Sequence, residues 1–186
     1  MTEVNAIFAH GLNGEFSLSD GSLPWKNISL LTEDARADME NFKSMTSGQI
    51  VIMGFNTYRT FSKPLPKRIN IVIDKNCSDG GSLNKIQQNN FNFFPSVESA
   101  LSFFYCEQKH VQDFSNKKIY IIGGAKLLDY ALEKNLITGK IYETVFNFNF
   151  PEARTFVKPL SEDWKIIEKH KLAEHSVLLT KVLNKK

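Results

Sequence analysis

Short runs of apolar residues recur along the chain, and segments with a helical pattern separate most of them. The runs "VNAIFAH", "QIVIMG", "RINIVID" and "KIYIIGG" are almost continuously apolar, which is typical of strands that helices cover on both faces. This alternation predicts an α/β fold with a mainly parallel sheet. The expected strands are 4–10, 49–54, 68–74, 118–124, 140–150 and 175–183, and the expected helices are 32–46, 56–61, 97–109 and 125–134.

The last two β-rich runs, 140–150 and 175–183, are long and have no helical pattern between them, which predicts an antiparallel hairpin at the end of the fold. The polar stretch 76–93 contains Gly80, Gly81 and many asparagines. We interpret it as an excursion between core elements, because apolar strands that need one sheet flank it. The chain of 186 residues is therefore expected to form a single domain, 1–186, that can bury a substantial core.

Composition narrows the class of protein. Hydrophobic residues make up 42% and charged residues 23%, as in ordinary globular domains. The net charge of +3 is too small to argue for a nucleic-acid partner, but it suits a small anionic ligand. Cys77 and Cys106 lack a paired spacing, so we expect reduced thiols in a cytoplasmic protein and no metal site.

The start "MTEVNAIFAHG" lacks the basic region of a signal peptide. No segment approaches the roughly 18 apolar residues of a membrane span. We therefore expect a soluble protein without membrane or nucleic-acid partners. The sequence does not decide between a monomer and a homodimer.

The segment "TEDARADMENFK" at 32–43 is rich in acids, and the question is which of them does chemistry. At about 100° per residue, Asp38 lies at the centre of an apolar helix face. That face comprises Leu31, Ala35, Phe42 and Met45, with Met39 at its margin, and the opposite side carries Glu33, Arg36, Glu40 and Lys43. An unpaired buried charge costs several kcal/mol, so Asp38 either pairs with a neighbouring hydroxyl or amide or binds a ligand.

Asp34 lies near the same apolar side. We interpret Thr32 as the N-cap of the helix, which places Glu33 and Asp34 in its first turn, where the helix dipole favours negative charge. Asp34 is therefore expected to be a helix-start residue.

Four motifs, "NAIFA" (5–9), "SLPWKN" (22–27), "IVIMGFNTYRTFSKPLPKRINIVI" (50–73) and "IYIIGGAKLLDYAL" (119–132), resemble dihydrofolate reductase in their order and spacing. The resemblance covers nearly the entire chain. It implies a dihydrofolate reductase-like fold, in which about four helices flank a central, mostly parallel mixed sheet of about eight strands that ends in an antiparallel C-terminal hairpin. It also implies reduction of 7,8-dihydrofolate to 5,6,7,8-tetrahydrofolate, with hydride transfer from NADPH to C6 and protonation of N5 through water.

The resemblance assigns a role to the acid. The family's catalytic carboxylate is followed four residues later by Phe, as Asp38 is by Phe42, so Asp38 would hold the 2-amino group and a ring nitrogen of the pterin. Thr144 matches the hydroxyl that bonds this acid, and Trp25 matches the residue that holds an ordered water beside it.

Further contacts carry over by position. The substrate-binding residues implied are Ile7, Ala9, Met39, Phe42, Phe61, Leu65 and Arg68, the last taking the α-carboxylate of the substrate. The cofactor-binding residues implied are Ala9, Phe16, Gly54, Asn56, Thr57, Asp74, Lys75, Ile122, Gly123, Gly124, Ala125, Lys126 and Leu127. Two helix starts, after Gly54 and after Gly124, would meet the cofactor phosphates.

The sequence also departs from the family pattern, in ways that resemble phage-encoded members. Phe55 stands where a cation often holds the 2′-phosphate of NADPH, which leaves that role to Lys75, Asn56 or Lys126. Other differences are Leu128 in place of Tyr, Ser17 in place of Gly in the loop over the site, and Ala153 or Arg154 in place of Asp. The spacing from Trp25 to Asp38 is longer than usual, and the insert "KNISLLTED" either extends the helix or forms a lid.

Two alternatives remain open at this point. One is the related pyrimidine reductase of riboflavin biosynthesis, which Trp25, Arg68 and the Asp38–Phe42 pair disfavour. The other is a non-catalytic nucleotide-binding or structural subunit with the same fold.

Overall fold

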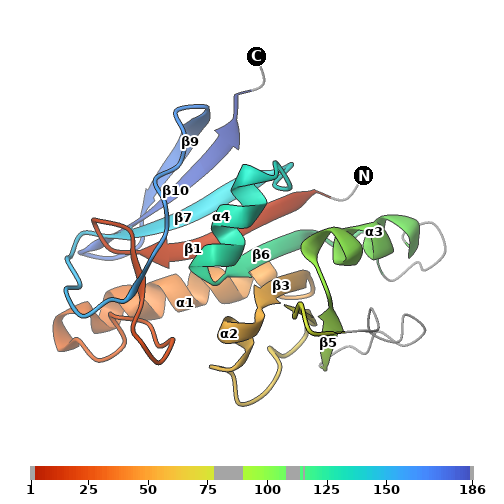
Figure 1. Cartoon of the computed structure of the whole chain (residues 1–186). Coiled ribbons are helices and arrows are strands. Elements are labelled where there is room, and N and C mark those ends of the chain that lie inside the picture. The colour runs from red at the N-terminus through yellow and green to blue at the C-terminus, as the bar shows by residue number, and fades with distance from the viewer. Residues whose placement is uncertain (1–2, 78–89, 108–113, 115, 185–186) are drawn as a thin grey trace.

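A computed structural model describes residues 3–77, 90–107, 114 and 116–184 of the protein. Its main feature is an eight-stranded sheet in the order β5-β4-β3-β6-β1-β7-β10-β9 (Figure 1). These strands are β1 (Val4–His10), β3 (Ile50–Gly54), β4 (Ile69–Ile73), β5 (Phe91–Phe94), β6 (Ile119–Gly123), β7 (Lys140–Phe146), β9 (Trp164–Lys171) and β10 (Ser176–Leu183). The helices are α1 (Thr32–Thr46), α2 (Phe55–Tyr58), α3 (Val97–Glu107) and α4 (Ala125–Glu133), with a 3₁₀ helix at Ser29–Leu31.

The sheet is mixed but mostly parallel. Strands β5, β4, β3, β6, β1 and β7 pair in parallel, and β10 and β9 are added antiparallel at one edge. The expected fold class is confirmed, and the predicted helix at 32–46 matches α1 at both ends.

Several expected boundaries were wrong. Strand β5 begins inside the stretch interpreted as an excursion, 76–93, and ends one residue beyond it, and residues 78–89 are outside the described part of the chain. Strand β9 was not predicted, and it is the partner of β10 in the C-terminal hairpin, whereas β7 and β10 pair across a long connection. Strand β7 ends at Phe146, because a turn follows in which the Phe148 N–H donates to the Phe146 carbonyl. Helix α2 begins and ends before its expected bounds of 56–61.

Different helices pack on the two faces of the sheet. Side chains of α3 and α4 pack with Val4, Ala6, Ile50 and Ile52 in the main core. Helix α1 lies on the opposite face, where its side chains contact β7 and β10. This separation follows from strand alternation, because successive residues of a strand point to opposite faces.

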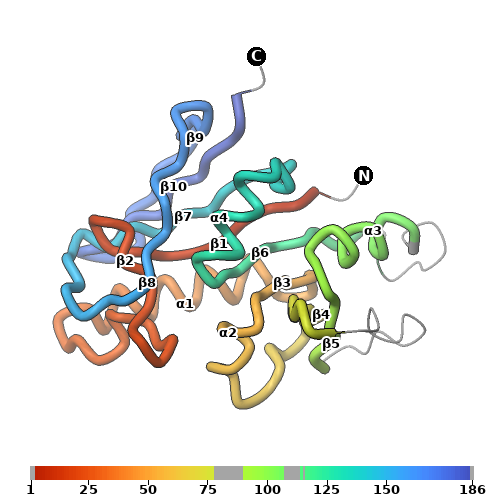
Figure 2. The backbone as a smooth tube through the Cα atoms, in the orientation of Figure 1, coloured from red at the N-terminus to blue at the C-terminus, as the bar shows by residue number. Residues whose placement is uncertain are grey.

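A separate two-stranded ribbon lies beside the sheet. It consists of β2 (Glu15–Ser17) and β8 (Thr155–Phe156), which pair antiparallel although they are far apart in the sequence (Figure 2). The Ser17 hydroxyl lies 2.6 Å from the Thr155 hydroxyl, and the Arg154 N–H donates to the Ser17 carbonyl. The ribbon thus holds the segment that follows β1 against the segment that follows β7.

Candidate active site

The candidate site lies at the carboxyl end of the parallel strands. Strand β1 is followed by α1 on one face of the sheet, whereas the neighbouring strand β6 is followed by α4 on the other face. Open α/β sheets bind ligands at such a switch point, outside the carboxyl ends of the strands. The residues expected from the sequence to contact substrate or cofactor come largely from this edge and from α1.

Asp38 is half-buried on α1 and faces Thr144 of β7. Burial raises the pKa of Asp38 to about 6, and a hydrogen bond from the Thr144 side chain opposes part of this rise. Thr144 is itself buried and lies opposite Ala9 of β1 in the sheet register, while Ile7 lies opposite Tyr142. The structure therefore brings Asp38 and Thr144 into contact, on the sheet face to which Ala9 and Ile7 also belong.

Trp25 is buried in a small cluster next to this site. Its ring stacks on Phe146 with centroids 4.4 Å apart, and it meets Phe150 at 5.6 Å. Leu31 belongs to the same cluster. The insert between Trp25 and Asp38 therefore returns to the Trp25 cluster through its 3₁₀ helix. Only its last three residues, 32–34, belong to α1, so the insert supplies less than one α-helical turn and the alternative in which it extends the helix is met only in part.

The interpretation of Asp34 as a helix-start residue was incomplete, and that of Thr32 as the N-cap was wrong. Leu31 occupies the N-cap position, and the Thr32 hydroxyl donates to the Ser29 carbonyl at 2.9 Å. Asp34 is 1% exposed, and its Oδ1 accepts hydrogen bonds from the Ser176 hydroxyl and the His175 N–H. Asp34 thus connects α1 to the start of β10, a contact that helix periodicity could not reveal.

Arg68 lies just before β4 and is 4% exposed. Its guanidinium carbon lies 5.5 Å from the centroid of the Phe42 ring. Its Nε is buried and has no hydrogen-bond partner within the described part of the chain. Burial lowers the pKa of Arg68, yet a guanidinium stays charged in proteins, so this group can still receive an anion.

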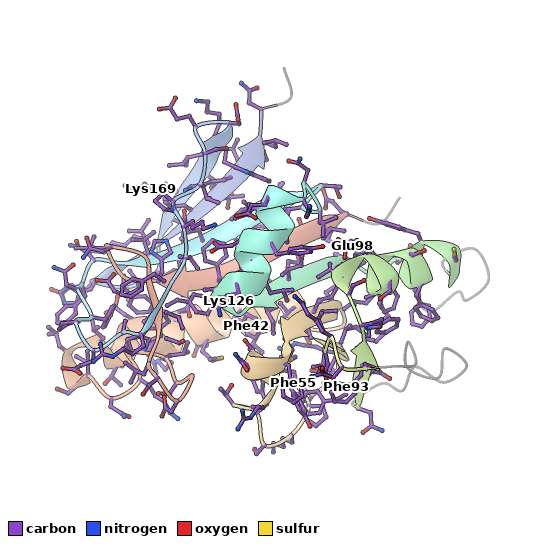
Figure 3. All side chains as sticks on the ribbon, viewed as in Figure 1. Phe42, Phe55, Phe93, Glu98, Lys126 and Lys169 are labelled. Carbon is purple, nitrogen blue, oxygen red and sulfur yellow. The ribbon has the colours of Figure 1, made fainter. Side chains whose placement is uncertain are left out.

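The other expected substrate residues lie around this pair. Phe61 and Leu65 are half-buried and pack against Val51, Met53 and Val72, whereas Met39 on α1 is 51% exposed. Figure 3 labels Phe42 on α1, Lys126 on α4 and Phe55 on α2, which are the three helices that border the carboxyl edge.

The expected cofactor residues meet where β3 and β6 end side by side. Met53 pairs with Gly123, so the turn at Gly54 adjoins the turn at Gly124. A Cβ added to Gly124 would lie 3.1 Å from Thr57 Oγ1. Gly123 has φ +121° and joins Gly124 through a cis peptide bond, and a Cβ there would lie 3.0 Å from the ring of Phe16. The positive φ of Gly123 and its closeness to the Phe16 ring favour glycine at that position.

The remaining expected cofactor residues differ in exposure. Asn56, Lys75 and Lys126 are exposed, Thr57, Asp74, Ile122 and Leu127 are half-buried, and Ala125 is buried. Asp74 Oδ1 accepts from the Asn76 N–H at 2.9 Å. Phe55 is 40% exposed and contacts Tyr58, while Leu128 is a fully buried core residue.

Two buried acids near the site were not singled out from the sequence. Glu143, next to Thr144, forms ion pairs with His10 and Lys181 on the other face of the sheet. Burial by itself would raise the pKa of Glu143, but His10 and Lys181 outweigh this effect and lower it. The sequence did contain a signal for Glu143. An acid inside the apolar run "IYETVF" is expected to be buried, and a buried charge needs a partner.

The second such acid is Glu15, which is 4% exposed in β2. Its Oε2 accepts from the Asn13 N–H at 2.7 Å, and its Oε1 accepts from Asn13 Nδ2 at 3.0 Å and from the Phe150 N–H at 3.3 Å. Burial would raise the pKa of Glu15, but these donors and its own backbone N–H lower it overall. Glu15 therefore fixes the segment that carries Phe16 toward Gly123.

The other parts of the described chain contain no equally strong candidate for a functional site. A hollow of about 290 Å³ at the opposite end of the sheet is lined by residues that include Glu3, Asn135 and Lys140. Among the residues that the structure covers, no group of three or more His, Cys, Asp or Glu side chains could hold a metal ion. Within the same ranges, no helix is both long enough and apolar enough to cross a membrane.

Comparison with known proteins places the chain in a family. The sequence model of dihydrofolate reductase matches residues 4–182, and the chain belongs to this family. It is 36% identical over 127 residues to the bifunctional dihydrofolate reductase-thymidylate synthase of Paramecium tetraurelia, covering 68% of this chain and 22% of that protein.

Further relatives align over most of their length. Dihydrofolate reductase from Haemophilus influenzae is 30% identical, over 79% of this chain and 74% of that protein. The fold is similar to that of dihydrofolate reductase from Enterococcus faecalis, solved in complex with NADP(H) and RAB-propyl. The TM-score is 0.70 at 19% identity, and the match covers 98% of this chain and 97% of the other.

Proposed function

We propose that the protein catalyses the NADPH-dependent reduction of 7,8-dihydrofolate to 5,6,7,8-tetrahydrofolate. Family membership supports this activity, and the observation that carries it is the Asp38–Thr144 pair at the carboxyl edge of the sheet. Among the described residues, Thr144 is the side-chain hydrogen-bond partner of the half-buried Asp38 carboxylate. The acid retains acceptor capacity, because an ionised carboxylate has about four lone-pair sites.

Asp38 would hold the pterin ring. Its two oxygens match the 2-amino group and the neighbouring ring N–H of the pterin, and paired charge-assisted hydrogen bonds of this kind fix orientation as well as affinity. The Thr144 side chain, which hydrogen-bonds the acid, would help to hold its orientation. Phe42, Phe61 and Leu65 would contact the ring system, and Trp25 would exclude bulk water from one side of the acid.

Arg68 would bind the α-carboxylate of the substrate. Its buried Nε has an unused N–H within the described residues, and the Phe42 ring limits the movement of the guanidinium plane. A bidentate pair between guanidinium and carboxylate satisfies that donor and compensates for the desolvation of both charges.

The turns at Gly54 and Gly124 fit a dinucleotide phosphate. Gly124 is the N-cap of α4 and has no side chain to occupy the first amides of the helix, so these amides can donate to an anion. A Cβ added to Gly124 would lie 3.1 Å from Thr57 Oγ1, so the two turns approach each other closely at this point. NADPH, when bound, supplies the hydride that reduces C6 of the substrate.

The residues of the chain orient the reactants. Asp38 and Arg68 would fix the two ends of the substrate, and the turns at Gly54 and Gly124 would fix the cofactor. Holding both in one geometry removes much of the entropic part of the barrier. No described side chain at the site is suited to deliver a proton directly to N5, so water would bring it, as in the sequence-based expectation.

The test is a direct assay. Purified protein is mixed with NADPH and dihydrofolate, and the loss of reduced nicotinamide is followed by absorbance for wild type and Asp38→Asn. We expect turnover in the wild type and a loss of at least about a hundredfold in the variant, since a positioned acid typically contributes that much. Absence of turnover in the wild type would overturn the activity, and equal turnover in the variant would overturn the site.

A further inference from the structure

Asp34 is a buried acid that has no role in the proposed reaction. It lies on α1 one turn before Asp38 and is 1% exposed. Its Oδ1 accepts the Ser176 hydroxyl at 2.6 Å and the His175 N–H at 2.8 Å. Such an arrangement holds two segments of the chain together, because both donors belong to the start of β10 and the acceptor belongs to α1.

The two acids of α1 contact neighbouring strands. Asp34 is bound to Ser176 of β10, and Asp38 is bound to Thr144 of β7. Strands β7 and β10 pair antiparallel, with Ser176 opposite Phe146 and Leu178 opposite Thr144. A helix fixed at two points to two strands of one sheet can neither rotate about its axis nor slide along it without breaking a hydrogen bond.

The same region also holds one end of the insert. Phe146, the register partner of Ser176, stacks on Trp25, and Leu31 packs in that cluster. The extra helical residues that precede Asp38 are thus held by Leu31 on one side and by Asp34 on the other. Without such contacts, the longer segment between Trp25 and Asp38 would leave the start of α1 free to shift.

From these contacts we infer that Asp34 is a positioning residue, which sets the rotation and height of α1 so that the Asp38 carboxylate meets the Thr144 hydroxyl. The inference rests on the proposed function only for its effect on turnover, because the geometry of Asp38 is a property of the free protein.

An electrostatic role for Asp34 is the main alternative. The titratable groups of the described residues that adjoin it include Glu33 and Asp38 on its own helix and His175 before β10, whose ring lies 4.0 Å from Glu174. The two roles separate in Asp34→Asn, because an amide oxygen still accepts from Ser176 and His175 but carries no charge. Positioning predicts that Asn rescues and Ala does not, whereas a charge effect predicts that both variants behave alike.

The experiment reads the ionisation of Asp38 directly. The carboxyl carbon of Asp38 is titrated by NMR in free wild type, Asp34→Asn, Asp34→Ala and Ser176→Ala, and kcat and KM are measured for the same proteins. Because the Thr144 hydrogen bond lowers the pKa of Asp38, its loss in Asp34→Ala should move the midpoint upward by about half a unit or more. We expect kcat to fall about tenfold with the KM for NADPH unchanged, as for a misplaced catalytic group.

Matched proteins complete the test. Asp34→Asn should lie within a few fold of wild type in kcat and keep the midpoint, and Ser176→Ala should shift both in the direction of Asp34→Ala. Leu101→Ala, a core truncation on α3, lowers stability on the opposite face of the sheet and should leave the midpoint in place.

An unchanged Asp38 midpoint in both Asp34→Ala and Ser176→Ala, or equal shifts in Asn and Ala, would overturn the inference. If Asp34→Ala does not fold, Ser176→Ala decides, since it removes only one of the two hydrogen bonds. Absence of wild-type turnover would overturn the proposed function instead, and the NMR titration would still decide the role of Asp34.

Discussion

The Arg68 guanidinium lies over the ring of Phe42, 5.5 Å from its centroid, and so joins the start of β4 to helix α1. The contact orients a charge whose Nε has no other partner in the described part of the chain. A cation held in this way is already arranged for a carboxylate.

Replacing Arg68 by Lys should weaken substrate binding. Lysine keeps the charge but loses the planar, two-pronged donor, and a charged hydrogen bond contributes about 1.5–3 kcal/mol. We expect the KM for dihydrofolate to rise roughly 10- to 100-fold with little change in kcat. Steady-state kinetics measure this, and Arg36→Lys on the solvent-exposed Glu33 pair is the control. An unchanged KM would show that Arg68 does not contact the substrate.

Asp38→Asn should stabilise the protein near neutral pH, although it lowers turnover. Burial raises the pKa of Asp38 to about 6, so the folded state binds its proton more tightly than the unfolded state does. The stability of the wild type should therefore decrease as pH rises from about 4 to 6 and stay lower above that range. The variant lacks this cost, and we expect a gain of about 1–3 kcal/mol at pH 7 that disappears near pH 4.

Urea denaturation at pH 4 and pH 7 measures this difference for both proteins. A gain of equal size at the two pH values would mean that the stabilisation does not arise from the ionisation of Asp38.

Gly123→Ala should impair cofactor binding more than its backbone strain alone would. Gly123 has φ +121°, and an added Cβ would lie 3.0 Å from the Phe16 ring. Gly48 also has a positive φ, +79°, but among the described residues no atom lies within 4 Å of its added Cβ. Both substitutions should cost about 1–2 kcal/mol of stability, whereas only Gly123→Ala should weaken NADPH binding, about tenfold or more.

Titration calorimetry with NADPH compares the two glycine variants with wild type. Equal affinities of Gly123→Ala and Gly48→Ala would argue against a cofactor site at this turn.

Glu15→Gln should loosen the segment that carries Phe16. The carboxylate accepts from the Asn13 N–H, from Asn13 Nδ2 and from the Phe150 N–H. In the glutamine variant an NH₂ group replaces one of the two acceptor oxygens and would face a donor from which it cannot accept. We expect a loss of about 1–3 kcal/mol of stability and faster NADPH dissociation in stopped-flow measurements. Asn149→Ala removes only the exposed outer partner of Asn13 and should stay within about 0.5 kcal/mol of wild type.

A dissociation rate for Glu15→Gln equal to that of wild type would mean that the Phe16 segment does not control access of the cofactor. A loss of stability without a change in that rate would assign Glu15 a purely structural role.

Much of the fold could be read from local sequence. Continuous apolar runs predicted four strands of the main sheet, β1, β3, β4 and β6, to within about a residue at each end, because burial on both faces leaves a clear pattern. Strand β9 had no such pattern, since nearly all its residues are exposed, and only pairing with β10 makes it a strand. Strand β5 is half-buried at the other edge and is short, so its signal was equally weak.

For the candidate site too, some residues could be predicted from local sequence and others only from the tertiary structure. Helix periodicity singled out Asp38, and resemblance to the family supplied Thr144 and Arg68 as its companions. The sequence by itself thus determined which residue types recur at which helical and strand positions, because 3.6- and 2-residue periods are local properties of the chain. Only the tertiary structure decided that Asp34, in the first turn of α1, also binds the start of β10, because its partner Ser176 lies 142 residues away. Local periodicity carries no information about a hydrogen bond that exists only once the strands have assembled.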